Sequence, residues 1–236
     1  MTVAAVILFA RGPEGALADA AGRTVVRRTV ESAWAGGATP IVVVCDDPSG
    51  SVAAALAGSP AVLAEPAPEE HGPVGQIVRG MAVAQEAITE TEAALVWPGR
   101  LAWVDAETVT SLIEAFGAMR QALLRPRYEG EAGWPALIPL GALGALSAQT
   151  ATSMPDELLD GLAKEGIELR LVDTGDPGTI HDIATPIDQL PAYHGPPEPV
   201  AGRVPEWGAA AADMSDDVPL EGPALAPYAQ AAEEGE

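Results

Sequence analysis

Short apolar runs alternate with longer amphipathic stretches over most of this chain. The apolar runs predict strands over residues 3–9, 41–45, 61–64 and 93–97. The stretches between them carry apolar residues at helical spacing, which predicts helices over residues 24–35, 49–57, 74–89 and 105–119. Continuous apolar strands bounded by helices are typical of a mostly parallel sheet that is covered on both faces. The pattern therefore predicts an α/β fold.

Capping and turn residues support these boundaries. Gly36 and Gly37 follow the first predicted helix, where glycine commonly ends a helix. Asp105 stands where an N-cap residue is expected before the helix that follows it. Further along, helix-start residues precede an amphipathic run over residues 153–166, and residues 167–172 (IELRLV) predict one more strand.

The composition changes near residue 193. Residues 193–236 are rich in proline, glycine, alanine and acidic residues and contain one basic residue, Arg203. Such a segment buries too little apolar surface to offset its chain entropy, so a disordered or loosely draped tail is expected. The alternative is an arm that docks on a protein partner through Trp207 and Tyr228. The chain thus divides into a domain over residues 1–192 and an acidic tail over residues 193–236.

Charge narrows the set of partners. The 236 residues include 34 acidic and 12 basic side chains, for a formal net charge of −22. This field repels phosphodiester backbones and anionic lipid, so nucleic acid and membrane surfaces are expected to be poor partners. The single cysteine, Cys45, ends an apolar run and is expected to be a small buried residue. With no disulfide, no basic leader and no apolar run long enough to span a membrane, a cytoplasmic protein is expected.

Four separated stretches together resemble the MobA-like NTP transferase family, whose members attach CMP or GMP to molybdopterin. They are VAAVILFARG with the following GRTVVRRTVESAWAGGATPIVVV, then GPVGQIVRGMAVA, then Leu95 through RPRYEGEAGWP, and finally LVDTGDPGTIHDIATPIDQL. The resemblance covers roughly residues 3 to 192. It implies the three-layer α/β/α fold, with a mostly parallel sheet, that the family shares with nucleotide-diphospho-sugar transferases.

The resemblance also implies a site. It places two residues in catalytic positions, Arg23 and Asp182, and makes Asp182 the candidate ligand of a magnesium ion. Nucleotide-binding positions fall on the first loop, on the second stretch and around the third, at Ala10, Arg11, Gly12, Gly15, Gly72, Gly80, Gly99, Gly133 and Trp134. Trp134 stands where the family has a histidine, and it would either stack on a base or pterin or fill the vacated site.

Two charged positions of the family are changed. Gly15 stands where the family's loop lysine is expected, and the chain's one lysine, Lys164, lies far downstream. Gly99 stands where a strand-end aspartate would bind magnesium, while Ala184 replaces the middle aspartate of the last stretch. Nucleotidyl transfer requires positive charge and a divalent ion at the phosphates.

Other residues near these positions allow two interpretations each. Gly12 and Gly15 would form either a phosphate loop or an ordinary turn. Arg27 and Arg28 would either replace the lysine or face solvent from a helix. Three side chains that could bind a metal could instead have structural roles. Asp105 could cap a helix, Asp188 could begin one, and His181 could be an ordinary surface residue.

Three functions follow from these observations. The favoured one is a divergent family member, degenerate at its catalytic site, that acts as a nucleotide-binding or interaction module. The alternative is an active CTP or GTP:molybdopterin nucleotidyltransferase that uses Arg11, Arg23 and Asp182 with magnesium. A nucleotide-sugar binder is the third, and it too would require carboxylates at the strand end.

Overall fold

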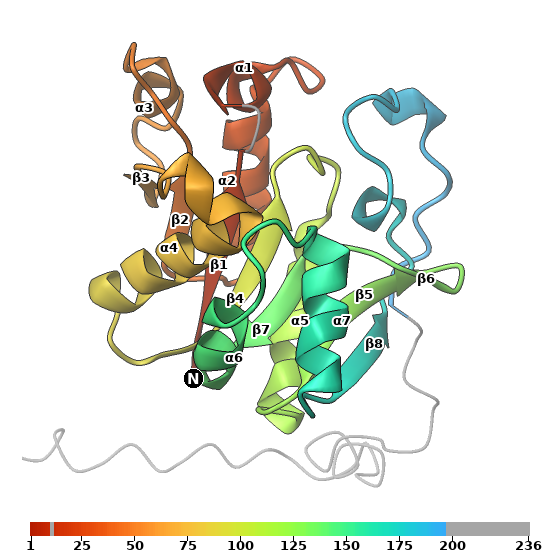
Figure 1. Ribbon diagram of the computed structural model, residues 1–236. Helices are drawn as coiled ribbons and strands as arrows, with labels where there is room; N and C mark the ends of the chain where they lie inside the picture. Colours follow the sequence, from red (N-terminus) through yellow and green to blue (C-terminus); the bar gives the residue numbers. More distant parts are fainter. Residues whose placement is uncertain (10–11, 197–236) are drawn as a thin grey trace, which may run out of the picture. The chain divides into compact units, whose positions relative to one another are not determined.

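The computed structural model describes residues 1–9 and 12–196, and these residues form a mixed sheet flanked by helices (Figure 1). The sheet order is β3-β2-β1-β4-β7-β5-β6, and β8 pairs with β5. Strands β1 to β4 are mutually parallel where they pair, β7 is antiparallel to both β4 and β5, and β8 is parallel to β5. The strands are β1 (Thr2–Leu8), β2 (Ile41–Val44), β3 (Ala61–Ala64), β4 (Thr91–Pro98), β5 (Leu123–Tyr128), β6 (Glu131–Ala132), β7 (Ala136–Pro139) and β8 (Leu169–Asp173).

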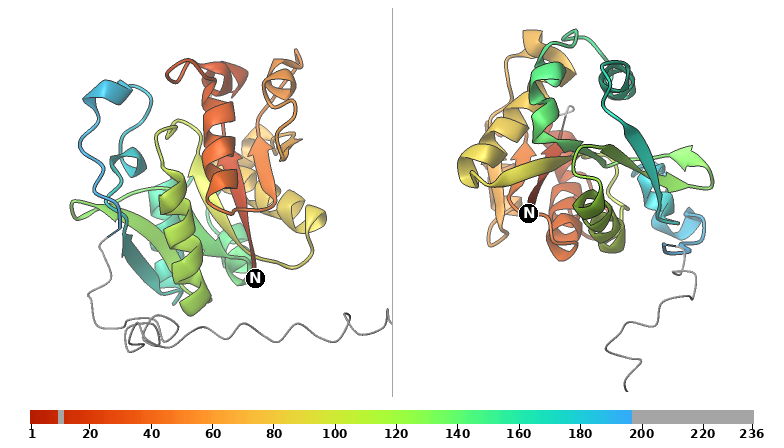
Figure 2. Two further views of the ribbon diagram at one scale, coloured as in Figure 1. Left: turned by 180° about the vertical axis from the view of Figure 1, so that it is seen from behind. Right: turned by 90° about the horizontal axis from the view of Figure 1, so that it is seen from below.

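Helices cover both faces of the sheet and complete three layers (Figure 2). Helices α4, α6 and α7 pack on one another on one face, and α2 packs beside α5 on the other. The helices are α1 (Gly12–Leu17), α2 (Val25–Ala35), α3 (Ser51–Ala55), α4 (Gly72–Ala87), α5 (Ala106–Ala118), α6 (Leu143–Ser147) and α7 (Pro155–Lys164), with 3-10 turns η1 (Glu69–His71), η2 (Leu140–Ala142), η3 (Pro177–Thr179) and η4 (Ile187–Gln189). The predicted three-layer α/β/α fold is confirmed.

The central strands have the burial that their uninterrupted apolar sequences predict. All four residues of β2 are buried, as are the five inner residues of β1, because helices cover both faces of these strands. Ala5 of β1 lies between Ile41 of β2 and Leu95 of β4. The covering helix α4 approaches β1 closely because it has a glycine, Gly80, at the contact, as described below.

The helix ends follow the predicted capping residues. Asp105 has extended backbone dihedrals, and its carboxylate accepts a hydrogen bond from the Glu107 amide at 2.9 Å, so the N-cap prediction is confirmed. Gly36 ends α2. A side chain at Gly36 would overlap Val109 of α5, since a Cβ there would lie 2.4 Å from the Val109 Cβ. Gly36 therefore also allows α2 and α5 to pack closely.

Two parts of the structure differ from the sequence expectation. The stretch expected to be a glycine-rich loop contains the short helix α1, which places Gly15 within a helix. Three strands, β5 to β7, form where the sequence predicted no element, and Glu129 and Gly130, both with positive φ, make the tight turn between β5 and β6. Charged residues and prolines in this region hide the alternation on which strand prediction depends.

A buried carboxylate attaches the segment after β8 to α5. Asp176 is 2% exposed, and its Oδ2 accepts hydrogen bonds from the Asp105 amide at 2.9 Å and the Thr108 hydroxyl at 2.7 Å. Its Oδ1 accepts one from the Gly178 amide at 2.8 Å. Burial raises the pKa of the Asp176 carboxyl, and these hydrogen bonds only partly counter it. This attachment fixes where the chain enters the segment that carries Asp182.

The expected tail falls mostly outside the described residues. Only residues 193–196 of the predicted 193–236 segment belong to the described part, so Trp207 and Tyr228 lie outside it. Tyr193 does belong to it, and its hydroxyl donates a hydrogen bond to Glu107 at 2.7 Å. Among the described residues, no helix is both long and apolar enough to cross a membrane.

Candidate functional site

The carboxyl ends of the parallel strands lie side by side at one edge of the sheet. The Phe9 amide, just after β1, donates to the Val44 carbonyl at 3.1 Å, and the Gly99 amide, just after β4, donates to the Leu8 carbonyl at 2.9 Å. We call the edge formed by the residues that follow β1, β2 and β4 the carboxyl rim. Open α/β sheets bind their ligands at such an edge. The rim therefore marks the candidate site.

Phe9 fills the space beside the end of β4. Its side chain is buried, at 8% exposure, and its ring lies against Gly99. A Cβ at Gly99 would approach the Phe9 Cε1 to 2.4 Å, which no real contact allows. Gly99 has no positive φ, so its backbone alone would accept a side chain. The Phe9 ring, in the position that it occupies here, thus leaves no room for a side chain at Gly99, where the resemblance predicts the family's aspartate.

Asp182, which with Asp188 is one of the two acids kept in the last motif, is paired with an arginine. Arg100, directly after Gly99, places its Nε 3.7 Å from Oδ2 of Asp182. The Arg100 carbonyl also accepts a hydrogen bond from the Ile183 amide at 3.1 Å, which ties the two loops together. The other carboxylate oxygen, Oδ1, accepts a hydrogen bond from the Ala184 amide at 2.9 Å. Asp182 therefore already has a cationic partner and a backbone donor.

A second guanidinium lies against the same segment. Arg28, in the first turn of α2, stands over the ring of Trp103 with its Cζ 4.9 Å from the centroid, which is cation–π geometry. The Trp103 Nε1 donates to the carbonyls of Asp182 and Thr185 at 3.1 and 3.0 Å. Arg28, Arg100, Trp103 and Asp182 form what we call the rim cluster.

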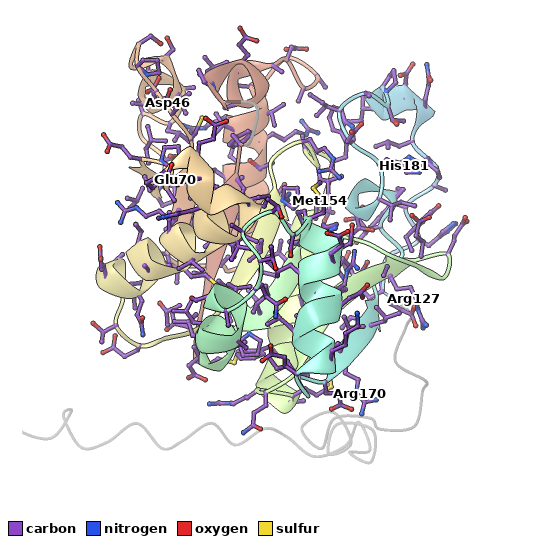
Figure 3. The ribbon with its side chains drawn as sticks, viewed as in Figure 1. Asp46, Glu70, Arg127, Met154, Arg170 and His181 are labelled. Carbon is purple, nitrogen blue, oxygen red and sulfur yellow. The ribbon has the colours of Figure 1, made fainter. Side chains whose placement is uncertain are left out.

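The described residues do not fit a divalent metal ion. Across residues 1–9 and 12–196, no three histidine, cysteine, aspartate or glutamate side chains gather where they could hold one. Magnesium prefers several oxygen ligands, whereas Asp182 has an arginine beside it. Figure 3 shows His181 on the segment that follows β8, where its amide donates to the Pro177 carbonyl. The residues present at the rim thus do not reproduce the magnesium site that the resemblance implied.

Arg23, the other predicted catalytic residue, is engaged elsewhere. Its guanidinium is exposed and pairs with Glu31 of α2, which also binds Arg27 at 2.9 Å. These two arginines hold the pKa of the Glu31 carboxyl below its usual value, and the hydrogen bond from Arg27 has the largest effect. The structure therefore separates the roles of three neighbouring arginines, because Arg28 alone joins the rim cluster while Arg23 and Arg27 serve Glu31.

Several of the predicted nucleotide-binding glycines are explained by close packing. A Cβ at Gly80 would lie 2.2 Å from Val6 Cγ1, and one at Gly133 would lie 2.6 Å from the Thr179 Cβ. Gly72 has φ +56 and faces the Ala151 carbonyl, which a Cβ would approach to 2.0 Å. Packing is sufficient to account for these glycines. Gly12 begins α1 with φ +65 and open space around it, while Ala10 and Arg11 lie outside the described residues.

Replacing Gly80 by alanine is expected to destabilise the protein by about 2 kcal/mol and to leave nucleotide affinity unchanged, because the added methyl overlaps the core of β1. Thermal unfolding and calorimetric nucleotide titration measure the two effects. Gly117→Ala is the matched control: Gly117 is also in a helix, but its Cβ would meet only Met1 at 3.8 Å, so this change should be neutral or slightly stabilising. Weaker nucleotide binding in the folded Gly80→Ala variant would contradict the packing interpretation.

Trp134 is buried rather than open to a ligand. It is 6% exposed, and the Arg125 guanidinium stands 5.1 Å from its ring centroid. Arg125 is held there by the Gly133 carbonyl at 2.9 Å and by Asp156 at 2.9 Å. Of the two interpretations of Trp134, filling of the site agrees with this arrangement and stacking on a base does not.

Two further features lie apart from the rim cluster. Cys45 is buried, and burial, with smaller contributions from Asp47 and Asp46, raises the pKa of its thiol to about 11, as expected for a small core residue.

At the opposite, amino edge of the sheet a hollow of about 550 Å³ opens where Glu92 pairs with Arg120. It is lined by Glu92, Phe116, Arg120, Gln121, Pro139, Leu140, Gly141, Ala142 and Ile167.

The fold and the position of the rim define an α/β domain whose candidate ligand site lies at the carboxyl edge of its sheet. The family model of the MobA-like NTP transferase domain matches residues 12–165, which is well over half of the chain. The chain belongs to this family, and the predicted resemblance is confirmed. No curated protein matches it by sequence.

Solved structures agree on the fold. Rv0371c of Mycobacterium tuberculosis H37Rv, in complex with manganese, is 18% identical with a TM-score of 0.56, covering 73% of this chain and 89% of that one. A nucleotidyl transferase from Methanothermobacter thermautotrophicus is 18% identical with a TM-score of 0.58, over 75% and 88% of the two chains. CMP:2-keto-3-deoxy-manno-octonic acid synthetase, in complex with CTP, is 15% identical with a TM-score of 0.54, over 74% and 90%.

The sequence analysis did not identify two residues of the site, Phe9 and Trp103. Phe9 is the one aromatic side chain in the run FARGPEG, which is the signal that an apolar side chain fills the space after β1. Trp103 gave no local signal, because its partners are Arg28, 75 positions earlier in the chain, and the carbonyls near Asp182, about 80 positions later. Only folding brings these residues together.

Proposed function

We propose that this chain is a MobA-like domain that binds a nucleotide at the carboxyl rim without a divalent ion and does not transfer it. The observation that carries the proposal is the ion pair between Arg100 and Asp182, beside a strand end that Phe9 closes to an acidic side chain. The guanidinium stands next to the carboxylate that a metal would need.

The electrostatics of the pair explain why a metal is disfavoured. A divalent cation bound by Asp182 would have to displace Arg100 or tolerate a positive charge at close range. Asp182 is only partly buried, so solvent screens the pair and its own stability is modest. The larger deficit is the missing second carboxylate, since hard cations require several oxygen ligands. Without the ion, the charge stabilisation on which nucleotidyl transfer depends is absent.

A second candidate, an active CTP or GTP:molybdopterin nucleotidyltransferase, is favoured by one observation. Asp182 is kept at the rim, at the position that the family resemblance makes catalytic and metal-binding, and Arg100 holds it there. The structural relatives with bound manganese and bound CTP make the same ligands reasonable to test here. In this candidate Arg100 would release Asp182 to magnesium.

The variant Asp182→Asn separates the two candidates by the sign of its effect. Asparagine keeps the oxygen that accepts the Ala184 hydrogen bond but removes the charge that neutralises Arg100. The metal-free proposal therefore expects tighter CTP or GTP binding in EDTA, by about threefold to tenfold, since a carboxylate no longer repels the phosphates. The active-enzyme candidate expects weaker, magnesium-dependent binding and loss of transfer.

Isothermal titration with CTP and GTP, in EDTA and with excess magnesium chloride, gives the readout. Asp188→Asn is the matched control, because Asp188 is exposed on η4 in the same segment and removes the same charge. Equal gains in both variants would mean that only the overall charge matters. Magnesium-dependent binding by the unaltered protein that is lost in Asp182→Asn would sink the proposal.

A further inference from the structure

The rim cluster carries little net charge, and this limits the ligand that it can hold. Arg28 and Arg100 supply two positive charges, and Asp182 removes one. Arg11 lies outside the described residues and would add at most one more. Lys164, the chain's single lysine, is in the last turn of α7. The described cluster thus offers about one net positive charge and no site for a divalent ion.

The charge of a ligand determines how well the rim cluster can bind it, because the whole molecule carries a formal net charge of −22. A nucleoside triphosphate brings about four negative charges, whereas a monophosphate brings about two and a phosphodiester one. In an acidic field, each charge that no local cation offsets costs binding free energy. The triphosphate would leave two or more charges without a partner, while the smaller anions are nearly neutralised.

Arg28 has the geometry of a phosphate ligand that is set in place before binding. A cation in the first turn of a helix is disfavoured by the helix dipole, so its position does not serve the stability of α2. Trp103 holds the guanidinium by its ring face, and two backbone carbonyls hold Trp103. Within residues 1–9 and 12–196, no carboxylate forms an ion pair with Arg28. Its donors remain available to a bidentate anion.

We infer that the rim binds a nucleoside monophosphate or a nucleotidyl phosphodiester in preference to a nucleoside triphosphate, with Arg28 as the phosphate-binding residue and Arg100 as the second cation. The ligand class is that of a nucleotidyl transfer product rather than its triphosphate donor. This inference depends on the proposed function, since it specifies which nucleotide the metal-free site accepts. Trp103 is a positioning residue, which acts by fixing Arg28.

Calorimetric titration of the full chain with CMP, GMP, CTP and GTP tests the inference, with each nucleotide measured in EDTA and in excess magnesium chloride. In EDTA, at least one monophosphate is expected to bind about threefold or more tighter than its own triphosphate. In excess magnesium the difference should shrink, because a bound magnesium ion lowers the charge of the free triphosphate to about two. Arg28→Gln is expected to weaken monophosphate binding about tenfold. Arg120→Gln, which removes the same charge at the amino edge of the sheet, should change it by less than about twofold.

Two outcomes would overturn the inference in distinguishable ways. If a triphosphate in EDTA binds as tightly as its monophosphate or tighter, the charge argument is wrong, while nucleotide binding at the rim still stands. If none of the four nucleotides binds, the proposed function fails and the inference fails with it. Thermal unfolding of each variant verifies the fold. The variant Trp103→Phe tests the positioning of Arg28 separately. Phenylalanine keeps an aromatic face for Arg28 but removes the Nε1 donor, so a partial loss of monophosphate affinity is expected.

Discussion

Replacing Asp176 by alanine is expected to lower the free energy of unfolding by about 3 kcal/mol. The buried carboxylate accepts from the Asp105 amide, the Thr108 hydroxyl and the Gly178 amide, and alanine would leave these three donors without a partner away from water. Because the first two donors begin α5 and the third follows β8, the change loosens the attachment between these elements. Chemical denaturation followed by circular dichroism measures the loss.

The control for this prediction is Asp188→Ala, which removes an exposed carboxylate from the same C-terminal segment and should cost less than about 0.5 kcal/mol. Burial raises the pKa of Asp176 in the folded protein above its unfolded value. A raised pKa means that the stabilising effect of this titration is full below the unfolded pKa and is lost as the pH rises through the folded pKa. The gap between the wild type and Asp176→Ala should therefore widen as the pH falls through the raised folded pKa toward the unfolded one. A constant gap would contradict the assignment of the buried charge.

The parallel half of the fold could be predicted because its signals are local. A fully buried strand such as β2 reads as an uninterrupted apolar run, and Asp105 and Gly36 mark helix ends by their own backbone chemistry. None of these signals requires knowledge of a distant partner. Each boundary was therefore visible in a window of a few residues.

Strands β5 to β7 were not visible in this way. Arg125 and Arg127 interrupt the apolar pattern of β5, and each is accommodated by an acid from elsewhere in the chain, Asp156 and Asp173 respectively. Figure 3 shows Arg127 and Arg170 along β5 and β8, where they form exposed ion pairs with Asp173 and Glu168. When the partner of a charged side chain lies far away in the sequence, the sequence around that side chain looks like a loop and not like a buried strand.

The sequence led to a prediction of which charged groups the candidate site lacks, but it did not predict which side chains fill their place. The family resemblance predicts that Gly15 and Gly99 replace charged residues, and this prediction needs only the order of motifs along the chain. What occupies the vacated space, the Phe9 ring and the Arg100 guanidinium, depends on contacts between the ends of β1 and β4 and the segment after β8. The loss of charge is thus a prediction from the sequence, while the ion pair between Arg100 and Asp182 is visible only in the fold.

Rebuilding the acidic strand end is expected to create magnesium-dependent nucleotide binding, but only when three residues are changed together. Gly99→Asp supplies the carboxylate, Phe9→Ala removes the ring that a Cβ at Gly99 would overlap at 2.4 Å, and Arg100→Gln removes the cation beside Asp182. The triple variant would then present two carboxylates to a metal ion, the arrangement that a hard cation prefers. We expect it to bind CTP or GTP at least about tenfold more tightly with magnesium than without.

The single variants show which obstacle matters at each step. Gly99→Asp alone should destabilise the protein by about 2 kcal/mol or more and gain no magnesium dependence, because the ring of Phe9 remains in place. Arg100→Gln alone should leave binding independent of magnesium, since Asp182 by itself offers too few oxygen ligands. Manganese titration followed by electron paramagnetic resonance reports metal binding without relying on catalysis. A triple variant that folds, as judged by circular dichroism, and still binds neither manganese nor nucleotide with magnesium would mean that Gly99 is not the family's acidic position, and the argument from Phe9 and Arg100 would fail with it.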